Sequence, residues 1–483
     1  MKYDVIIIGG GICGTALAYE LSKYQNKILL LDKANDVAVG TTKANSGIVH
    51  AGYDPIPNTL MAKYNVQGNK MIRELAKKLD VPFKKTGSFV LAFNQDEQKT
   101  LEKLLERGEQ NGVPELSILS GDEARALEPN LSEEVVGALY AKTAGVVSPW
   151  ELALAFAEVA VRNGAEVKLN CEVKAITKNG NAFVLQTNDG ELETKFVVNA
   201  AGIQSDTVAS FVGKPTFEIK PSKGEYYLLD KSQGNLTSRV IFQCPNENGK
   251  GILVSPTAHG NLIVGPNAQD TGRDDTATSI TNLAYIRKMG LKSIPSINFR
   301  DNIRNFAGLR ANATETDFII GEDPNTSGFF HIAGIKSPGL TAAPAIACDV
   351  AKMLFESGLS KKSNPNFDGT RKVIRLKELT NEQREKVIAE NPLYGRVICR
   401  CETITEGEIE DALHSPLPPV SIDGVKRRCG TGMGRCQGGF CGVRVHEILA
   451  RHYGVSLPEI MLDKQNSYIL TGETKGGSCN ESL

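Results

Sequence analysis

The strongest constraint on the fold lies at the N-terminus. A β-rich run at 3–8 leads into the glycine-rich run 9–14, and a segment with helical character follows at 16–22. A second apolar strand, at 27–31, then ends at Asp32. This order of strand, glycine turn, helix and strand predicts a βαβ unit, and the G-x-G-x-x-G spacing of the turn indicates a dinucleotide site. A carboxylate at the end of the second strand is placed to accept hydrogen bonds from a ribose.

Each glycine of the turn has a separate role in such a site. Gly9 permits the tight turn, Gly11 lets the backbone approach a pyrophosphate, and Gly14 allows the helix to pack closely on the strand. The helix N-terminus, where Ile12 and Cys13 lie, contributes amide donors and the positive end of its dipole to the phosphates. A purely structural glycine turn is the alternative, but the strand, the helix and the acid in this order favour cofactor binding.

Composition and charge exclude several classes of protein. With 483 residues, of which 41% are apolar and 23% charged, the chain can build two or more hydrophobic cores. A formal net charge of -1 is not typical of a protein that binds nucleic acid or anionic membranes. No apolar run approaches the roughly 20 residues that span a bilayer, and the N-terminus, with Asp4 and early glycines, lacks the pattern of a signal peptide. We therefore expect a cytoplasmic protein without a transmembrane segment.

The rest of the chain mixes helices and strands and contains one clear change of composition. Residues 88–91 and 225–229 are predicted as strands. Residues 357–371 are rich in Ser, Lys, Asn, Pro and Gly, which is typical of a linker between separately folding units. After this linker, Thr380 and Gln383 have the spacing of a capping box that opens a helix.

Three segments resemble motifs of the D-amino-acid-oxidase-like flavoprotein superfamily. Residues 40–52 are similar to its second flavin-binding stretch, 197–206 to its later strand and glycine turn, and 334–341 to its C-terminal flavin motif, and they follow in the expected order. The resemblance implies FAD as the cofactor. It also implies an α/β fold in which a Rossmann-like FAD-binding domain is interleaved with an antiparallel-sheet substrate domain, and 224–227 and 265–268 would belong to that sheet.

The resemblance also implies which residues lie beside the cofactor, in addition to those of the glycine turn. These are Asp32, Lys33, Thr41, Thr42, Asn45, Ser46, Val173, Ala200, Ala201, Gly202, Ser205, Gly308, Gly334, Ser337, Pro338, Gly339, Leu340 and Thr341.

The C-terminal region carries a cysteine cluster. Of ten cysteines, five fall between 399 and 441, and Cys399, Cys401, Cys436 and Cys441 form a C-x-C pair and a C-x4-C pair. Four thiolates suit either a [2Fe-2S] cluster or tetrahedral zinc. Zinc ribbons usually use C-x2-C turns, which are absent here, so the spacing favours iron and sulfur over structural zinc or unligated thiols. Cys429 is either a spare thiol or a replacement for one of the four.

The surroundings of the cysteines agree with a cluster. Several glycines leave backbone amides able to point at sulfur. Four basic residues would offset negative charge: Lys426, Arg427, Arg428 and Arg435. Residues 435–441, with 399–402 upstream, resemble the bacterioferritin-associated-ferredoxin-like [2Fe-2S] domain, which implies a small, mainly helical fold. Thr405 and Glu408 have the spacing of a capping box that starts its first helix.

The two resemblances imply a division of the chain into four parts. These are a FAD-dependent oxidoreductase at 1–357, a linker and helix at 358–392, the [2Fe-2S] domain at 393–460 and a tail at 461–483. In the first part, FAD-binding segments alternate with substrate-domain segments. The former are about 1–80, 145–212 and 305–357, and the latter about 81–144 and 213–304.

Three residues are candidates for the chemistry. Hydride transfer to a flavin needs a group that takes the hydroxyl proton, a cation that holds an anionic substrate, and positive charge near flavin N1. His50 directly follows the flavin loop and is expected beside the isoalloxazine. By resemblance, Arg310 corresponds to an arginine that holds phosphate or carboxylate, and Lys336 to a lysine near the flavin of glycerol-3-phosphate dehydrogenases. The alternatives are a structural histidine, a structural ion pair and a solvated lysine.

Fusion to the cluster domain resembles flavin dehydrogenases of the glycerol-3-phosphate type. This resemblance implies an oxidoreductase that converts glycerol 3-phosphate to dihydroxyacetone phosphate and passes electrons from FAD to a [2Fe-2S] cluster and then to a partner. A dehydrogenase of 2-hydroxy acids, similar to the L-2-hydroxyglutarate oxidase group, is a second interpretation. A non-catalytic electron-transfer subunit is a third.

The expected ligands and partners follow from these interpretations. The substrate would be a small anionic hydroxy compound. No second G-x-G-x-x-G occurs, so NAD is not expected to bind this chain. A cluster without an internal acceptor implies a partner protein, either a second flavoprotein or a quinone-linked carrier, and we expect an oligomer or hetero-complex.

Overall fold

The computed structural model describes residues 2–245 and 251–472, which form two compact units. The first unit contains the chain up to Lys33 and residues 37–372, and the second contains residues 34–36 and the chain from Val373 onward. Within the described ranges, no helix has the combination of length and apolarity needed to cross a membrane.

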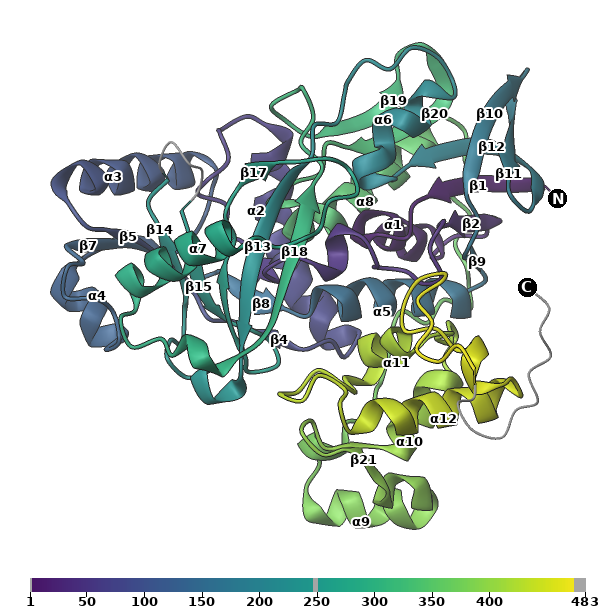
Figure 1. Ribbon diagram of the computed structural model, residues 1–483. Coiled ribbons are helices and arrows are strands. Elements are labelled where there is room, and N and C mark those ends of the chain that lie inside the picture. The colour runs from purple at the N-terminus through teal and green to yellow at the C-terminus, as the bar shows by residue number, and fades with distance from the viewer. Residues whose placement is uncertain (1, 246–250, 473–483) are drawn as a thin grey trace. The chain divides into compact units, whose positions relative to one another are not determined.

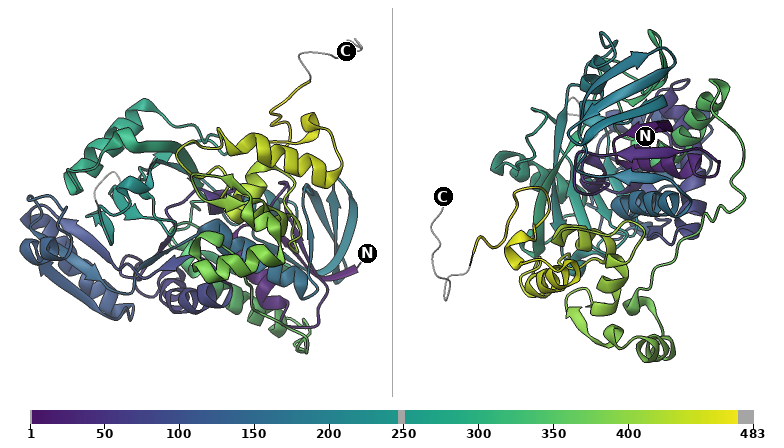
Figure 2. Two further views of the ribbon diagram at one scale, coloured as in Figure 1. Left: turned by 90° about the horizontal axis from the view of Figure 1, so that it is seen from below. Right: turned by 90° about the vertical axis from the view of Figure 1, so that its right-hand side faces the viewer.

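One sheet of the first unit contains the predicted βαβ unit. β1 (Lys2–Ile8) pairs in parallel with β2 (Ile28–Leu31) on one side and with β12 (Gly190–Asn199) on the other, and α1 (Ile12–Leu21) connects β1 to β2. The other strands are β9 (Glu166–Lys168), β10 (Val173–Asn179), β11 (Ala182–Thr187), β19 (Ile319–Asp323) and β20 (Thr326–Ala333). Because β12 also pairs in parallel with β20, and β2 with β9, the carboxyl ends of five strands share one edge. β1, in purple, lies beside the teal strand β12 (Figure 2).

Helices pack against one another around this sheet (Figure 1). α1 packs on α5 (Pro149–Arg162) and on α8 (Gly339–Glu356), and α8 packs on α2 (Leu60–Lys78). Nearly every residue of α1 is buried, which fits its lack of charged side chains apart from Glu20. The second half of β1, from Val5 to Ile8, is apolar throughout, which is typical of a parallel sheet covered on both faces.

The second sheet of the first unit is larger. Its strands run in the order β17, β13, β16, β15, β14, β5, β7, β6, and β18 pairs with the other edge of β13. Their bounds are β5 (Ser88–Ala92), β6 (Leu116–Ser120), β7 (Gly137–Ala141), β13 (Ser222–Leu229), β14 (Val240–Gln243), β15 (Leu253–Pro256), β16 (Leu262–Gly265), β17 (Gln269–Asp270) and β18 (Asn302–Arg310). The sequence predicted an antiparallel sheet, but β14 and β5 pair in parallel. These two strands come from distant parts of the chain and no hairpin joins them, so the turn geometry that enforces antiparallel pairing is absent.

The remaining elements of the first unit are short. A three-stranded sheet contains β3 (Ile48–Val49), β8 (Gly145–Val147) and β4 (Phe83–Lys84). The other helices are α3 (Gln95–Gln110), α4 (Gly121–Leu127), α6 (Ser205–Ser210) and α7 (Ile280–Ser293), with 3-10 turns at Thr41–Lys43, Gly202–Gln204, Lys231–Gln233 and Phe299–Asp301. β3 matters for function because the predicted flavin loop leads into it.

The second unit is mainly helical, as expected. Its elements are α9 (Asn381–Glu390), α10 (Glu406–Leu413), α11 (Ile422–Cys429), α12 (Cys441–Tyr453), the β21 (Val397–Cys399) and β22 (Ile404–Thr405) pair, and 3-10 turns at Leu376–Glu378, Pro392–Gly395 and Leu457–Glu459. Both predicted capping boxes are confirmed, at Thr380 for α9 and at Thr405 for α10. The start of the predicted tail folds back, since Met461 bridges to Ser421. The rest of the tail, from residue 473, lies outside the described residues.

Candidate functional site

In the glycine turn after β1, two glycines are in tight contact with other backbone atoms, and a third has open space beside it. Gly9 has φ +112°, and a Cβ there would lie 2.3 Å from the carbonyl oxygen of Ala200, so the turn and the end of β12 are in backbone contact. A Cβ on Gly14 would lie 2.0 Å from the carbonyl oxygen of Gly9. For Gly11 the nearest atom to a Cβ would be Thr42 Oγ1 at 3.4 Å, so the protein leaves room there. This open space would admit a phosphate group, which needs such an approach to the backbone.

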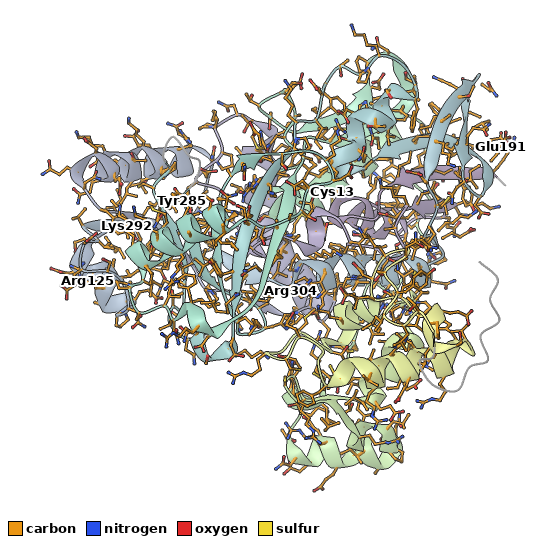
Figure 3. The ribbon with its side chains drawn as sticks, viewed as in Figure 1. Cys13, Arg125, Glu191, Tyr285, Lys292 and Arg304 are labelled. Carbon is orange, nitrogen blue, oxygen red and sulfur yellow. The ribbon has the colours of Figure 1, made fainter. Side chains whose placement is uncertain are left out.

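Two backbone amides at the start of α1 already have partners within the protein. The helix starts without a side-chain cap. The Gly10 amide donates to Asp32 Oδ2 at 2.7 Å, and the Ile12 amide donates to Thr42 Oγ1 at 3.0 Å. Cys13 is buried on α1 (Figure 3), and this burial raises the pKa of its thiol to about 12, so it is a neutral packing group. Asp32 directly follows β2 beside the glycine turn, which is where a ribose-binding carboxylate is needed.

A second turn, after β12, meets the glycine turn at this edge. The Asn199 side chain holds it, because Oδ1 accepts from the Ala201 amide at 3.3 Å and Nδ2 donates to the Ser205 carbonyl at 2.7 Å. Gly202 has φ +57°, which favours glycine. Val173 opens β10 with its side chain in the core of this sheet, so only its backbone could face a cofactor.

The predicted flavin loop is fastened to β18. Thr41 Oγ1 donates to the Leu309 carbonyl at 2.7 Å, and Asn45 Nδ2 donates to the Thr42 carbonyl at 2.8 Å. A Cβ on Gly308 would lie 1.9 Å from the carbonyl oxygen of Ala44, so β18 and the loop touch through their backbones. Glycine at 308 is therefore required for packing. Lys33, which was also predicted to lie beside the cofactor, is exposed two residues after the end of β2.

The loop between β20 and α8 reaches the same region. Gly334 has φ +66°, and the Ser337–Pro338 peptide bond is cis. α8 begins at Gly339, without a side-chain cap, and contains Leu340 and Thr341 in its first turn. Thr341 Oγ1 accepts from the His50 amide at 2.9 Å, which joins the first turn of α8 to the flavin loop. An uncapped helix N-terminus at this place can stabilise negative charge on a reduced flavin.

Arg310 lies at the end of β18 in a polar network. Its Nη2 donates to the Asn267 carbonyl at 2.9 Å, and its guanidinium also hydrogen-bonds with the Tyr226 hydroxyl, which in turn bonds with Ser46. A Cβ on Gly224 would lie 2.4 Å from Nη2, so glycine makes room for the arginine. Burial raises the pKa of Tyr226, and the Arg310 charge opposes this rise. Arg310 Nη1 is buried and has no hydrogen-bond partner among the described residues.

His50 follows β3, and hydrogen bonds hold both its main chain and its imidazole. Its carbonyl accepts from Asn69 Nδ2 at 2.9 Å, while its Nε2 lies 3.2 Å from Ser337 Oγ. The imidazole stacks on Phe242, with ring centroids 5.6 Å apart. No local sequence pattern indicates this aromatic partner, because Phe242 is distant in the chain and lies on a short strand, β14. Lys336 precedes Ser337 in the same loop and is half-buried.

Four cysteines of the second unit converge. The thiols of Cys401 and Cys436 are 3.6 Å apart, and Cys399 and Cys441 are hydrogen-bonded to each other. That bond from the Cys441 thiol lowers the pKa of Cys399 to about 6, and the same bond raises the pKa of Cys441. None of the cysteines described is in a disulfide. Four thiol sulfurs from two loops are the donor set that a [2Fe-2S] cluster needs.

Backbone amides point at these sulfurs, as the glycine content predicted. The Gly432 amide bonds with Cys399 and Cys441, and the Gly438 and Phe440 amides bond with Cys436. Such bonds stabilise thiolate and sulfide charge, so the loops fit a cluster.

The structure bears on two predictions about residues close to the four cysteines. Cys429 ends α11, its thiol donates to the Val425 carbonyl at 3.4 Å, and burial raises its pKa to about 12, which favours a spare thiol over a replacement ligand. Arg427 and Arg428 were expected to offset cluster charge, but this is wrong. Both are buried and paired with carboxylates of the second unit, Arg427 with Asp463 at 2.8 Å and Arg428 with Asp36 at 2.9 Å. Buried guanidinium groups need such partners, and their charge is already neutralised.

Two family models match the chain. The model of the FAD dependent oxidoreductase family matches residues 4–353, and that of the BFD-like [2Fe-2S] binding domain matches residues 397–451. The first match includes every loop described above for the dinucleotide and flavin, and the second includes all four converging cysteines.

Similar proteins were found by sequence and by structure. A glycerol 3-phosphate dehydrogenase of Caloramator mitchellensis is 48% identical over 476 residues, which cover 98% of this chain and 99% of that protein. The structure of the dithionite-reduced L-alpha-glycerophosphate oxidase of Mycoplasma pneumoniae with FAD bound has a TM-score of 0.74 and 34% identity, and the match covers 77% of this chain and 99% of the other. An L-2-hydroxyglutarate dehydrogenase of Indibacter alkaliphilus is 29% identical, with 73% of this chain and 98% of that protein covered.

Proposed function

Because the chain belongs to the family of FAD-dependent oxidoreductases, we propose that it oxidises glycerol 3-phosphate to dihydroxyacetone phosphate and delivers the electrons, by way of a [2Fe-2S] cluster, to a partner protein. The relative that is similar over nearly the whole of both chains is named a glycerol 3-phosphate dehydrogenase. When bound, FAD supplies an acceptor for a hydride and the cluster supplies an acceptor for single electrons.

The observation that carries the substrate proposal is the state of Arg310. Its guanidinium is held by Asn267 and Tyr226, yet Nη1 is buried and lacks a hydrogen-bond partner in the described chain. An unpaired buried donor of this kind costs about 1–3 kcal/mol or more. An anionic group with several oxygens, such as a phosphate, satisfies it through a charge-assisted hydrogen bond. Arg310 would therefore bind the phosphate of the substrate.

His50 would take the hydroxyl proton. Oxidation of a secondary alcohol removes a hydride from carbon and a proton from oxygen, and a neutral imidazole accepts that proton near pH 7. Its Nε2 is directed toward the loop that opens α8, where Ser337 Oγ lies 3.2 Å away, and Phe242 fixes the ring plane. Ser46 belongs to the same loop as His50 and contacts Tyr226, so the loop connects the proton acceptor to the Arg310 network.

Lys336 and the first turn of α8 would supply positive charge near the flavin. Lys336 is half-buried in the loop before Gly339, and α8 starts there without a side-chain cap. A cation together with the positive end of a helix dipole favours the anionic reduced form of a flavin.

The test is anaerobic reduction of the purified enzyme by glycerol 3-phosphate, followed by flavin absorbance. We expect rapid bleaching in the wild type. Arg310→Met is expected to weaken substrate binding and lower kcat/KM by about 100-fold or more, the loss of a buried charged pair. Arg304→Met is the matched control, because Arg304 lies on the same strand but is exposed (Figure 3). Equal rates in the Arg310 and Arg304 variants would rule out this role for Arg310.

A 2-hydroxy acid is the second candidate substrate. The Indibacter alkaliphilus protein, which is named an L-2-hydroxyglutarate dehydrogenase, is similar over most of its length, and a guanidinium binds carboxylate as well as phosphate. Bleaching by L-2-hydroxyglutarate and not by glycerol 3-phosphate would replace the first proposal with this one. If neither compound bleaches the flavin, the chain would instead be an electron-transfer subunit.

A further inference from the structure

The cluster loop of the second unit exposes two apolar side chains. Phe440 is 84% exposed and Val443 is 64% exposed. Phe440 is the N-cap residue of α12, and Val443 lies three residues further, so the two share one face of the first helical turn. An exposed aromatic ring beside a second apolar side chain is unfavourable in water unless a partner covers it.

This apolar pair adjoins the open side of the cysteine cluster. The Phe440 amide hydrogen-bonds with the Cys436 sulfur, so the residue contacts the cluster site through its main chain and solvent through its ring. Cys399 and Cys441 are only 1% and 2% exposed, whereas Cys401 is exposed. Electrons that leave the cluster would therefore have their shortest way out on the side of Cys401 and Cys436.

Two arginines adjoin the cysteines of this side. Arg400 lies between two of the cysteines and Arg435 directly precedes a third, and both side chains are exposed. Arg444, the next basic residue, pairs with Glu447 at 2.9 Å. The exposed guanidinium groups of Arg400 and Arg435 thus adjoin the cysteines on the side where Cys401 is exposed.

We propose that Phe440 and Val443, with Arg400 and Arg435 at their edge, form the docking surface for a small one-electron carrier protein that has an acidic face and an apolar recess. An aromatic anchor inside a charged rim is the arrangement in which a few residues supply most of the binding energy, and an acidic face complements the arginines. The surface deepens the proposed function, since it presupposes that electrons leave through the cluster. Each substrate molecule oxidised gives two electrons and two protons, so a one-electron carrier docks twice and the protons go to solvent.

The first test is binding of an acidic flavodoxin to the oxidised full-length holoenzyme, measured by calorimetry without substrate. Removal of the Phe440 ring by Phe440→Ser is expected to weaken binding about 10- to 100-fold, from the transfer free energy of a buried aromatic ring. Val443→Ser repeats the test with a smaller loss if the first variant holds less iron than the wild type. Ile280→Ser is the control, because Ile280 is 88% exposed on α7 of the first unit. If Phe440→Ser and Val443→Ser, loaded with iron, both bind like the control, the docking surface is not here.

The second test uses charge. Reversal by Arg400→Glu with Arg435→Glu is expected to weaken flavodoxin binding about tenfold at low salt, and the difference is expected to vanish near about 0.5 M salt. Lys386→Glu is the control, since its side chain is 77% exposed on α9 of the same unit. Cytochrome c, a basic carrier, should bind more weakly than flavodoxin. Tighter binding of cytochrome c, or no effect of the reversal, overturns the acidic partner.

Two further outcomes separate this inference from the proposed function. If glycerol 3-phosphate fails to reduce the cluster while Phe440→Ser still loses flavodoxin binding, the function proposal fails and the docking surface stands. If Phe440→Ser binds flavodoxin normally but changes the sedimentation coefficient from that of an oligomer to that of a monomer, the surface joins copies of this chain, and the inference is wrong.

Discussion

Replacement of Gly11 by Ala should separate cofactor binding from folding. A Cβ at this position would meet only Thr42 Oγ1, at 3.4 Å, and the backbone is already at φ -73° and ψ 179°, which alanine adopts easily. The cost to the protein without cofactor is therefore small, about 0.5–1 kcal/mol, for alanine in place of glycine at a helix N-cap. The methyl group would, however, occupy the space where we place the pyrophosphate of FAD.

The expected loss of FAD affinity is much larger than this loss of stability. If the methyl group displaces the diphosphate from two amide donors, and each hydrogen bond to a charged group contributes about 1.5–3 kcal/mol, then affinity falls by at least about 3 kcal/mol, or roughly 100-fold. Quenching of flavin fluorescence during titration of apoprotein measures the affinity, and urea unfolding of the apoprotein measures the stability.

Two other glycine substitutions serve as controls. Gly14→Ala should destabilise the apoprotein itself by about 2 kcal/mol or more, because its Cβ would lie 2.0 Å from the Gly9 carbonyl oxygen. Gly272→Ala should change neither property, since no atom lies within 4 Å of its Cβ and it lies outside the segments assigned to FAD. Equal FAD affinity of Gly11→Ala and Gly272→Ala would refute this placement of the pyrophosphate.

Three further predictions follow from the described contacts. Cys429→Ser should keep a full complement of iron, because its thiol is neutral. Cys441→Ser should lose the iron. Equal iron content in the two variants would contradict our ligand set. Thr405→Ala removes the N-cap of α10 and should lower the stability of the second unit by about 1 kcal/mol in urea unfolding, with an unchanged midpoint as the contrary result. Burial lowers the pKa of His331 below its ordinary 6.5, although Asp323 opposes this, so the folded state binds fewer protons than the unfolded state and stability should fall as pH decreases below 6.5. His331→Asn should remove that part of the pH dependence, and identical pH profiles would refute it.

The sequence predicted features that depend on short-range patterns. The βαβ unit, the two capping boxes and the mainly helical second unit all follow from residues within about 30 positions of one another, where spacing alone determines the geometry. The cysteine cluster was also predictable, because thiolate chemistry leaves few uses for four cysteines at this spacing.

Features that depend on distant parts of the chain were not predictable. The parallel pairing of β5 with β14, the stacking of Phe242 on His50, and the contact of Tyr226 with both Ser46 and Arg310 each join segments far apart in sequence. Arg427 was misjudged for a related reason. Its position near the cysteines suggested a role in cluster charge, but a partner carboxylate that no local pattern reveals neutralises it.

The most direct test of the whole account is electron paramagnetic resonance of the purified enzyme, frozen after anaerobic addition of glycerol 3-phosphate. If substrate electrons pass from the flavin to the cysteine-bound cluster, the signal of a reduced [2Fe-2S] centre should appear, and it should be absent from Cys441→Ser. A bleached flavin with no such signal, or a protein that contains zinc in place of iron, would contradict the account.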